Sequence, residues 1–220
     1  MGSNVFGTPV TTATLRTMPE YQGKNSITQQ DRAKVALEKV NAEGKAVDAR
    51  NSVEKLQARF GGGGDDVVST MCLIYNATGD TMTYVIARDW KGRVCESAYP
   101  VIIANGQWGA FLHGQYYNQE KMSRVGIVYS ALNNQGKEQH WFMGFSNNYS
   151  GPTNQVYTEI RKPGHYEQVE SVGIWQALGD KVSNGKLVNQ ANEEGGYISG
   201  SIGNTAKPIF EVIMTLPEAK

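Results

Sequence analysis

The sequence has few cysteines and few histidines. Its 220 residues include two cysteines, Cys72 and Cys95, and three histidines. Two cysteines are too few for a disulfide-stabilised scaffold, so we expect both to be free, buried thiols. The histidines His113, His140 and His165 stand at unrelated spacings, with no cysteine or aspartate at the offsets of metal ligands. The sequence therefore predicts no metal site and no cofactor.

Charge of one sign and long apolar runs are also missing. Lys and Arg number 21, as do Asp and Glu, so the formal net charge at pH 7 is +0. The longest basic stretch, 34–45, alternates with glutamates, which predicts a solvated helix face and no nucleic-acid binding. No run reaches the roughly 18 apolar residues that a transmembrane helix needs. Because the N-terminus lacks the features of a secretory signal, we expect a cytoplasmic protein.

Composition changes once along the chain, at the four glycines of 61–64. Consecutive glycines lose much backbone entropy on ordering and pack no side chain, so the sequence predicts a linker over 61–66. This linker would separate an N-terminal extension, 1–60, from a β domain, 67–220.

The extension carries the pattern of two short amphipathic helices. Thr28 is a suitable N-cap, with Asp31 three residues later, and together they predict a helix over 29–43. A second helical pattern covers 46–60. Since only Gly44 and Lys45 separate the two, we expect an antiparallel helical hairpin.

Beyond the glycines the hydrophobic period falls to two residues and turn residues recur every 8 to 12 positions, as in an all-β domain. Turns at 76–80 and at Asn105-Gly106 predict hairpins. We expect a short helix over 165–172 and a central, buried closing strand over 209–216. The fold class is mainly β, an antiparallel β-sandwich or squat barrel with strands over 67–76, 81–88, 99–104, 107–113, 125–132, 139–145, 156–161 and 209–216.

Catalytic signatures are scarce. The sequence contains no Gly-x-Ser-x-Gly motif, and the glycine run lacks the Lys and Ser/Thr of a phosphate-binding loop. A Ser-His-Asp triad assembles only in three dimensions, yet no residue is marked as its nucleophile, and Cys72 lies in an apolar strand run that favours an inert thiol. The sequence therefore favours a protein that is not an enzyme.

Aromatic and amide side chains are plentiful, with 11 Tyr, 4 Trp and many Asn and Gln residues within 133–155. Aromatic rings beside amides can hold a sugar face or a choline-type headgroup through stacking, hydrogen bonds and cation–π contact. Strand positions predict core packing for Trp90, Trp108 and Trp141. Tyr149, in the polar loop 146–154, and Tyr157 are the better candidates for a binding site.

The sequence resembles the 23 kDa jasmonate-induced proteins of plants over nearly its whole length. This family implies a protein induced by a wounding hormone, salt or drought, without an established enzymatic activity. The resemblance rests on the ordered blocks Val5-Phe6-Gly7-Thr8-Pro9, Met18-Pro19-Glu20-Tyr21, Arg32-Ala33-x-Val35-Ala36-Leu37, Cys72-Leu73-Ile74-Tyr75-Asn76-Ala77-Thr78-Gly79, Asp89-Trp90-x-Gly92, Asn105-Gly106-Gln107-Trp108-x-Ala110-Phe111-Leu112-His113, Glu159-Ile160-Arg161 and Gly164-His165.

The β region is also similar, more distantly, to actinoporins and fungal fruit-body lectins. The similarity rests on the order of an Asn-x-Thr-Gly turn, the strand 125–129, the block 141–146, a Tyr-bearing loop and an apolar closing strand. It implies a β-sandwich that binds phosphocholine or glycans, and it carries Val125, Tyr149 and Tyr157, with Asn154 beside them, onto the ligand-binding region. The Trp-rich membrane face of actinoporins is replaced here by Gly151-Pro152-Thr153-Asn154-Gln155-Val156.

These observations predict a non-enzymatic plant stress or defence protein whose β-sandwich binds a glycan or lipid headgroup. One alternative is a pore-forming cytolysin that uses the N-terminal helices; another is a structural or storage-like oligomer. Peripheral membrane contact and a homo-oligomer are compatible with the first interpretation. Dye release from vesicles would distinguish the cytolysin from the binding protein.

Overall fold

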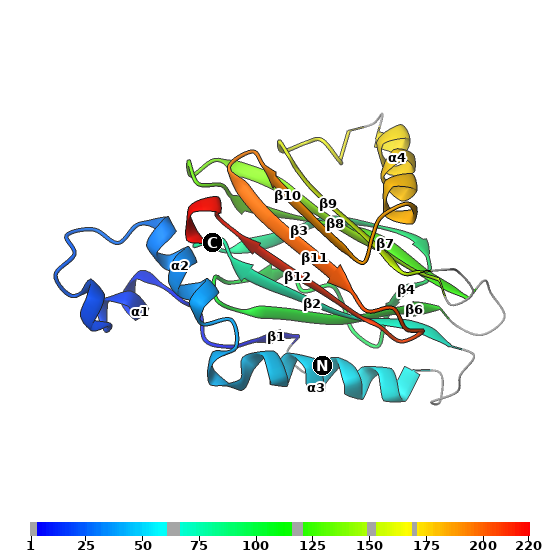
Figure 1. Ribbon diagram of the computed structural model, residues 1–220, viewed down its shortest axis with the longest axis horizontal. Coiled ribbons are helices and arrows are strands. Elements are labelled where there is room, and N and C mark those ends of the chain that lie inside the picture. The colour runs from blue at the N-terminus through cyan, green and yellow to red at the C-terminus, as the bar shows by residue number, and fades with distance from the viewer. Residues whose placement is uncertain (1–3, 61–66, 116–120, 149–152, 169–170) are drawn as a thin grey trace.

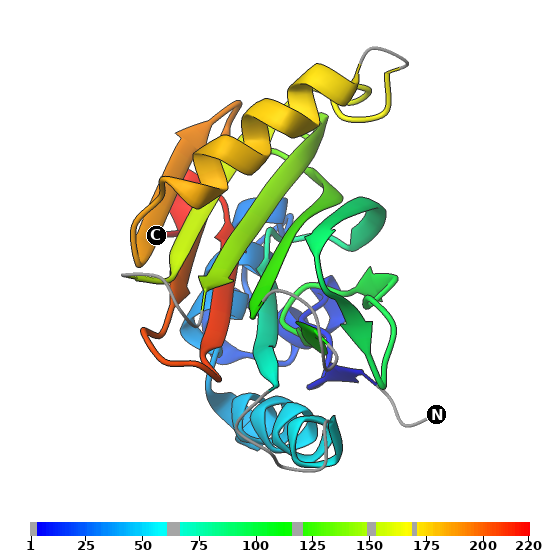
Figure 2. The ribbon, with the colours of Figure 1, turned by 90° about the vertical axis from the view of Figure 1, so that its right-hand side faces the viewer.

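The computed structural model describes residues 4–60, 67–115, 121–148, 153–168 and 171–220. Two β-sheets lie face to face, and helices cover the outer face of each sheet, so that the chain forms four layers (Figures 1 and 2). The expected linker, 61–66, lies outside the described residues, and the domain boundary there stays a prediction.

Sheet A and sheet B form the two central layers. Sheet B has the order β5-β3-β7-β8-β9, and its strand pairs are antiparallel. In sheet A, β12 runs parallel to β2, unlike the other described pairs. The mainly β sandwich is thus confirmed, with one parallel pair at the centre of sheet A. Sheet A comprises, in spatial order, β1 (Val5–Phe6), β6 (Trp108–Gln115), β2 (Val68–Ala77), β12 (Ile209–Thr215), β11 (Gly196–Ile202) and β10 (Val188–Glu193), with β4 (Arg93–Cys95) beside β6; sheet B comprises β5 (Ile102–Ile103), β3 (Met82–Lys91), β7 (Met122–Leu132), β8 (Glu138–Asn148) and β9 (Gln155–Arg161).

Strand β2 is buried along its whole length because both of its faces are covered. Cys72 and Ile74 point into the core between the sheets, whereas Leu73 and Tyr75 pack under the N-terminal helices. This two-sided burial explains why the middle of β2, residues 71–75, shows no alternation of apolar and polar residues. Both Cys72 and Cys95 are buried and free, as expected.

Helices α2 (Gln29–Glu38) and α3 (Lys45–Arg59) cover sheet A, and α1 (Thr12–Arg16) packs beside α2 beyond the end of the sheet. The Thr28 side chain accepts from the Asp31 backbone and the Asp31 side chain accepts from the Thr28 backbone, so the predicted start of α2 is confirmed. The two predicted helices are confirmed, but α2 and α3 pack mainly on the strands of sheet A and less on each other, with Ala36 and Val53 fully buried in a shared apolar cluster. Short 3-10 helices occupy Pro19–Tyr21, Ala42–Gly44 and Pro217–Ala219.

A fourth helix, α4 (Ser171–Ser183), covers sheet B. The short helix expected over 165–172 is wrong, since residues 163–167 form turns and α4 begins at Ser171. A Cβ atom at Gly144 of β8 would lie 2.7 Å from Cγ2 of Val182, so this glycine permits the close approach of α4 to the sheet. Trp175 packs at the edge of Trp90, with 5.9 Å between ring centroids.

Both expected hairpins are wrong, because the two turns connect different sheets. The turn at 76–80 joins β2 of sheet A to β3 of sheet B, and Asn105-Gly106 joins β5 of sheet B to β6 of sheet A. At this corner the buried Asn105 side chain accepts from Gly79 N and donates to Val10 O and Arg32 O. The Asn105-Gly106 pair therefore makes tertiary contacts here and does not form a two-residue hairpin.

Candidate functional site

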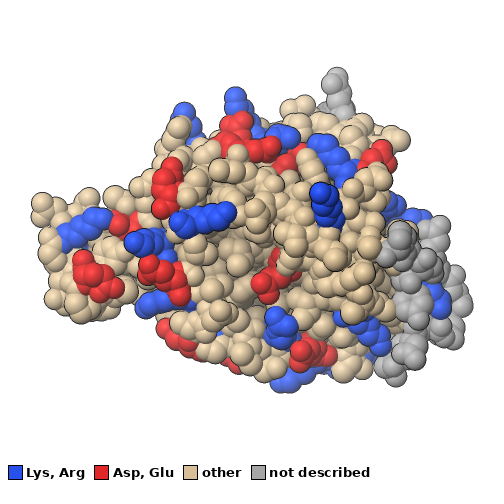
Figure 3. Space-filling model, viewed as in Figure 1, with Lys and Arg blue, Asp and Glu red and all other residues tan. Residues whose placement is uncertain are grey.

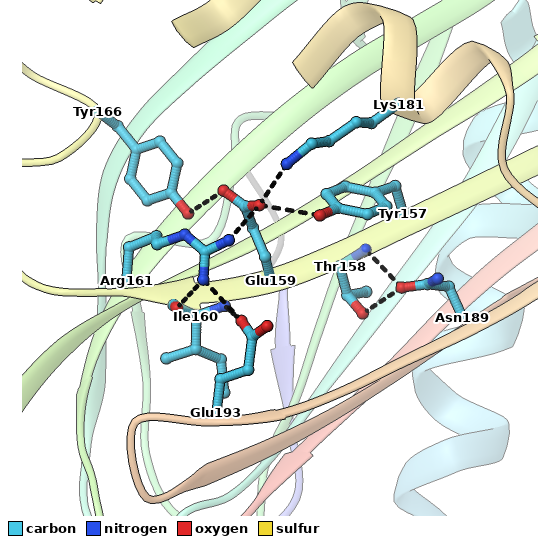
Figure 4. Close-up of polar contacts among 9 residues, drawn as sticks. All are labelled: Tyr157, Thr158, Glu159, Ile160, Arg161, Tyr166, Lys181, Asn189 and Glu193. Carbon is cyan, nitrogen blue, oxygen red and sulfur yellow. Dashed lines mark hydrogen bonds and ion pairs between the residues drawn. The ribbon is translucent and has the colours of Figure 1, made fainter. Parts of the chain in front are cut away.

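Strand β9 presents alternate side chains to the two faces of sheet B. Val156 and Ile160 enter the core between the sheets, whereas Tyr157, Glu159 and Arg161 lie on the outer face beside α4 (Figure 4). Tyr157, which the sequence marked as a binding residue, is thus half-buried at the surface.

Tyr157 lines an open groove between β9, the end of α4 and the start of β10. The groove encloses about 730 Å³, which is within the range of small-molecule sites. Its lining combines one aromatic ring, two lysines, three amide side chains and one apolar side chain. The lining residues are Tyr157, Lys181, Asn184, Gly185, Lys186, Val188, Asn189 and Gln190.

The wall between β9 and β10 is fixed by hydrogen bonds that do not form a regular ladder. Val156 N donates to Lys186 O over 2.8 Å, and Thr158 donates to Asn189 Oδ1 through both its backbone N, at 2.9 Å, and its Oγ1, at 2.8 Å. β9 is the edge of sheet B, so these contacts cap backbone donors that would otherwise be open to another strand. They also hold Lys186 and Asn189 next to Tyr157.

Beneath the groove lies Glu159, a carboxylate that is 2% exposed. Its Oε2 accepts from Tyr157 Oη at 2.9 Å, from Lys181 Nζ at 3.1 Å and from an Arg161 Nη2 at 3.0 Å. Its Oε1 accepts from Tyr166 Oη at 3.1 Å. All four donors converge on this carboxylate in Figure 4.

These contacts decide the ionisation of the cluster. Burial by itself raises the pKa of Glu159, but the hydrogen bonds from Lys181 and Tyr157 and the nearby charge of Arg161 outweigh it, and the pKa is lowered. Burial lowers the pKa of Lys181, yet its bonds to Tyr157 and Glu159 outweigh that effect and the pKa is raised. Both groups are therefore charged at neutral pH.

Lys181 also makes a cation–π contact. Its Nζ lies 5.0 Å from the centroid of the Tyr157 ring, within the distance at which a ring face attracts a cation. The Lys181 side chain is 46% exposed, so the ammonium group sits at the mouth of the groove. On the other side, Tyr157 packs on Phe142 with 6.2 Å between centroids.

The other predicted binding residues differ in their positions. Val125 does not line the groove, because it is fully buried in the core between the sheets. Asn154 is 3% exposed and donates to Gly203 O and Thr205 O, so its amide fixes neighbouring loops. Tyr149 lies outside the described residues. Tyr157 alone among the four is described at an accessible groove.

A Ser-His-Asp arrangement occurs elsewhere in the structure. His113 Nδ1 lies 2.8 Å from Ser123 Oγ and its Nε2 lies 3.2 Å from Asp89 Oδ1. Ser123 and His113 are both 0% exposed, so the described arrangement gives a substrate no route to the hydroxyl. It links β6 to β7 and β3, and burial lowers the pKa of His113.

Two further features bear on the predictions from composition. Within the described ranges, no group of three or more His, Cys, Asp or Glu side chains is arranged to hold a metal ion. Basic and acidic side chains are interspersed on the face seen in Figure 3, which shows no broad basic surface.

The sequence alone missed Glu159, Lys181 and Lys186. Lys181 and Lys186 follow the end of β9 by twenty residues or more and reach it only because α4 folds back on sheet B. A signal was present for Glu159, since an acidic residue between the apolar Val156 and Ile160 implies a partner on the outer face.

Comparison with known proteins assigns nearly the whole chain to one family. A family model described as "Nakanori-like protein" matches residues 6–217. The chain belongs to the Nakanori-like family. It is 37% identical over 217 residues to the 23 kDa jasmonate-induced protein of Hordeum vulgare, with 96% of this chain and 99% of that protein covered. The resemblance to jasmonate-induced proteins is thus confirmed.

One solved structure agrees with this family assignment. The crystal structure of the lipid binding protein Nakanori matches with a TM-score of 0.80 and 28% identity, over 96% of this chain and 98% of that chain. A lectin of Xerocomus chrysenteron aligns with a TM-score of 0.47 and 12% identity, over 67% of this chain and 99% of that chain.

Proposed function

We propose that this Nakanori-like protein binds the headgroup of a choline-containing lipid in the groove beside Tyr157. The observation that carries the proposal is the match to the lipid binding protein Nakanori along nearly the full length of both chains. The groove adds the chemistry: an aromatic face and a carboxylate suit an ammonium group, and a lysine with amides suits a phosphate.

The two halves of a phosphocholine group fit different parts of the groove. The Tyr157 ring, backed by Glu159, would receive the quaternary ammonium. Lys186, Asn189 and Gln190 would receive the phosphate. Each charged end of the phosphocholine group would thus face side chains of opposite charge, which would fix the orientation of the headgroup as well as contribute to its affinity.

Apolar side chains flank the groove. Val188 is 54% exposed and Leu187 is 36% exposed, and both lie beside Lys186. Apolar groups next to a lysine are suited to the interface of a bilayer, where the apolar part contacts acyl chains and the ammonium group stays in water. We propose peripheral contact of this kind, since no described helix is both long and apolar enough to cross a membrane.

We infer that the protein acts by binding and not by catalysis, in the response to stress or defence that the jasmonate-induced relative suggests. The buried Ser123 and His113 support a structural role for the one triad-like arrangement described. The expected cytoplasmic location, the homo-oligomer and the pore-forming alternative stay predictions.

Co-sedimentation with vesicles tests the proposal. We expect binding to phosphatidylcholine vesicles, competition by soluble phosphocholine, and weaker binding to phosphatidylethanolamine vesicles, whose ammonium group is smaller and more strongly hydrated. Binding that requires phosphatidylglycerol and resists phosphocholine would contradict the headgroup assignment. Binding to immobilised glycans without binding to any of these vesicles would favour the glycan alternative, and release of a trapped dye would favour the cytolysin.

A further inference from the structure

The ammonium position that the groove offers is already filled by the protein itself. Lys181 Nζ lies 5.0 Å from the centroid of the Tyr157 ring and 3.1 Å from Glu159 Oε2. A ring face and a carboxylate that share one cation are the two parts of a site for an alkylammonium group. Figure 4 shows Lys181 reaching this position from α4, above the strand that carries the other two residues.

Glu159 does not depend on Lys181 for its hydrogen bonds. Without it, the carboxylate keeps the 3.0 Å contact with Arg161, the 2.9 Å bond from Tyr157 and the 3.1 Å bond from Tyr166. The buried charge would therefore remain paired and hydrogen-bonded if Lys181 moved away.

The attachment of α4 does not depend on Lys181 either. Trp175, Leu178 and Val182 of this helix are buried in an apolar cluster with Val128 and Phe142 of sheet B. The Lys181 side chain is 46% exposed, so its ammonium group can exchange its contacts for water at a small cost. Side-chain rotation, with the helix in place, is enough to vacate the position.

We propose that Lys181 is an internal occupant of an ammonium site formed by Tyr157 and Glu159, and that a ligand's ammonium group enters only when Lys181 turns out into solvent. The proposal rests on the proposed function, since it concerns how the same groove is regulated. Lys181 then weakens the binding of every ammonium compound, and a headgroup that is also held through its phosphate offsets this cost.

The test is a calorimetric titration of the full chain with two probes, tetramethylammonium and phosphocholine. The central variant is Lys181→Met, which keeps the length of the side chain and removes its charge. We expect both probes to bind this variant roughly twofold to fivefold more tightly than wild type, the range given by an exposed cation–π contact. Lys181→Arg is the matched control, because it retains a cation, and it should leave both affinities close to those of wild type.

Equal or weaker binding of tetramethylammonium by Lys181→Met would overturn the proposal, as would tighter binding by Lys181→Arg to the same degree. A thermal melt of each variant establishes that it is folded, and Lys181→Gln replaces Lys181→Met if the latter does not fold.

The proposed function and the internal occupant can be rejected separately. If wild type binds phosphatidylcholine vesicles but Lys181→Met binds tetramethylammonium no more tightly than wild type does, only the internal occupant is rejected. Tight tetramethylammonium binding by Lys181→Met without vesicle binding by wild type rejects the lipid function alone.

Discussion

The two outer layers of the sandwich contain nearly the same lysine–tyrosine pair in opposite surroundings. On sheet A, Lys45 Nζ lies 5.1 Å from the Tyr75 ring centroid; on sheet B, Lys181 Nζ lies 5.0 Å from that of Tyr157. Lys45 is 3% exposed, whereas the Lys181 side chain is 46% exposed. The same contact is sealed under α2 and α3 in one layer and open to a groove in the other.

The pKa values of the two lysines shift in opposite directions because of this difference. Burial lowers the pKa of Lys45, whose ammonium group has Tyr75 Oη and Gly106 O as partners and forms no ion pair with a carboxylate of the described residues. The pKa of Lys181 is raised because its bonds to Tyr157 and Glu159 outweigh the effect of burial. The first pair fixes helices to a sheet, and the second has the exposure and charge that binding requires.

The largest effect is expected from Tyr75→Ala. This side chain is 0% exposed and its Oη donates to Ala36 O over 2.6 Å. The variant should lose about 3–5 kcal/mol of unfolding free energy, as for other buried aromatic residues, while vesicle binding per folded molecule is unchanged. Urea denaturation followed by tryptophan fluorescence measures the loss. A weaker affinity in the fraction that stays folded would show that the two layers are not independent.

Glu159→Gln should have the next largest effect. Because the pKa of Glu159 is lowered on folding, its ionised form adds stability above the ordinary glutamate pKa of about 4.3, and this stability is lost as pH falls through the lowered value. The variant should lose about 1.5–3 kcal/mol at pH 7 and show a flatter dependence of melting temperature on pH between 5 and 3. If the melting temperatures of wild type and variant changed with pH in the same way, Glu159 would not be the source of this pH dependence.

A smaller effect is expected from Tyr157→Leu, which removes the ring at the groove. An aromatic contact contributes on the order of 1 kcal/mol, so phosphocholine affinity should fall roughly fivefold with a small change in melting temperature. Tyr157→Phe is the control, since it keeps the ring and loses the bond to Glu159. A large loss of stability with unchanged affinity per folded molecule would assign Tyr157 to packing alone.

The smallest effect is expected from Lys186→Ala. An exposed charge contributes about 0.2–1 kcal/mol to an ion pair, which predicts up to a fivefold weaker binding to phosphatidylcholine vesicles, decreasing with added salt. Lys55→Ala on α3 is the matched control, because this lysine is also exposed and lies on the opposite layer. Equal losses in the two variants would show a nonspecific effect of charge.

The sequence predicts the sheets better than their connections. Strands with strong apolar patterns, such as β7 and β8, lie where period-two alternation places them, and the Thr28 cap marks the start of α2. The strand β10 was missed because its sequence, Val188–Glu193, is mostly polar: Ala191 enters the core, whereas most of the other side chains are exposed. The two turns that connect sheet A to sheet B have the residues typical of hairpin turns. Only tertiary contacts decide whether such a turn forms a hairpin within one sheet or connects two sheets.

The candidate site was predictable only in part. Tyr157 could be found from its ring and its amide-rich surroundings. Val125 could have been excluded, since it shares its strand face with the apolar Ile127 and Tyr129, and all three are buried. Lys181 could not be found, because its contact with Glu159 depends on how α4 crosses β9.

The position of bound phosphocholine on the 15N-labelled protein is the most direct test of the central claim. The account predicts saturable chemical-shift changes for amides of β9 near Tyr157, for the end of α4 near Lys181 and for residues 186–190, with none along α3. Changes confined to the opposite layer, around Arg50 and Glu211 where a second groove lies, or no saturable change at millimolar phosphocholine, would contradict it.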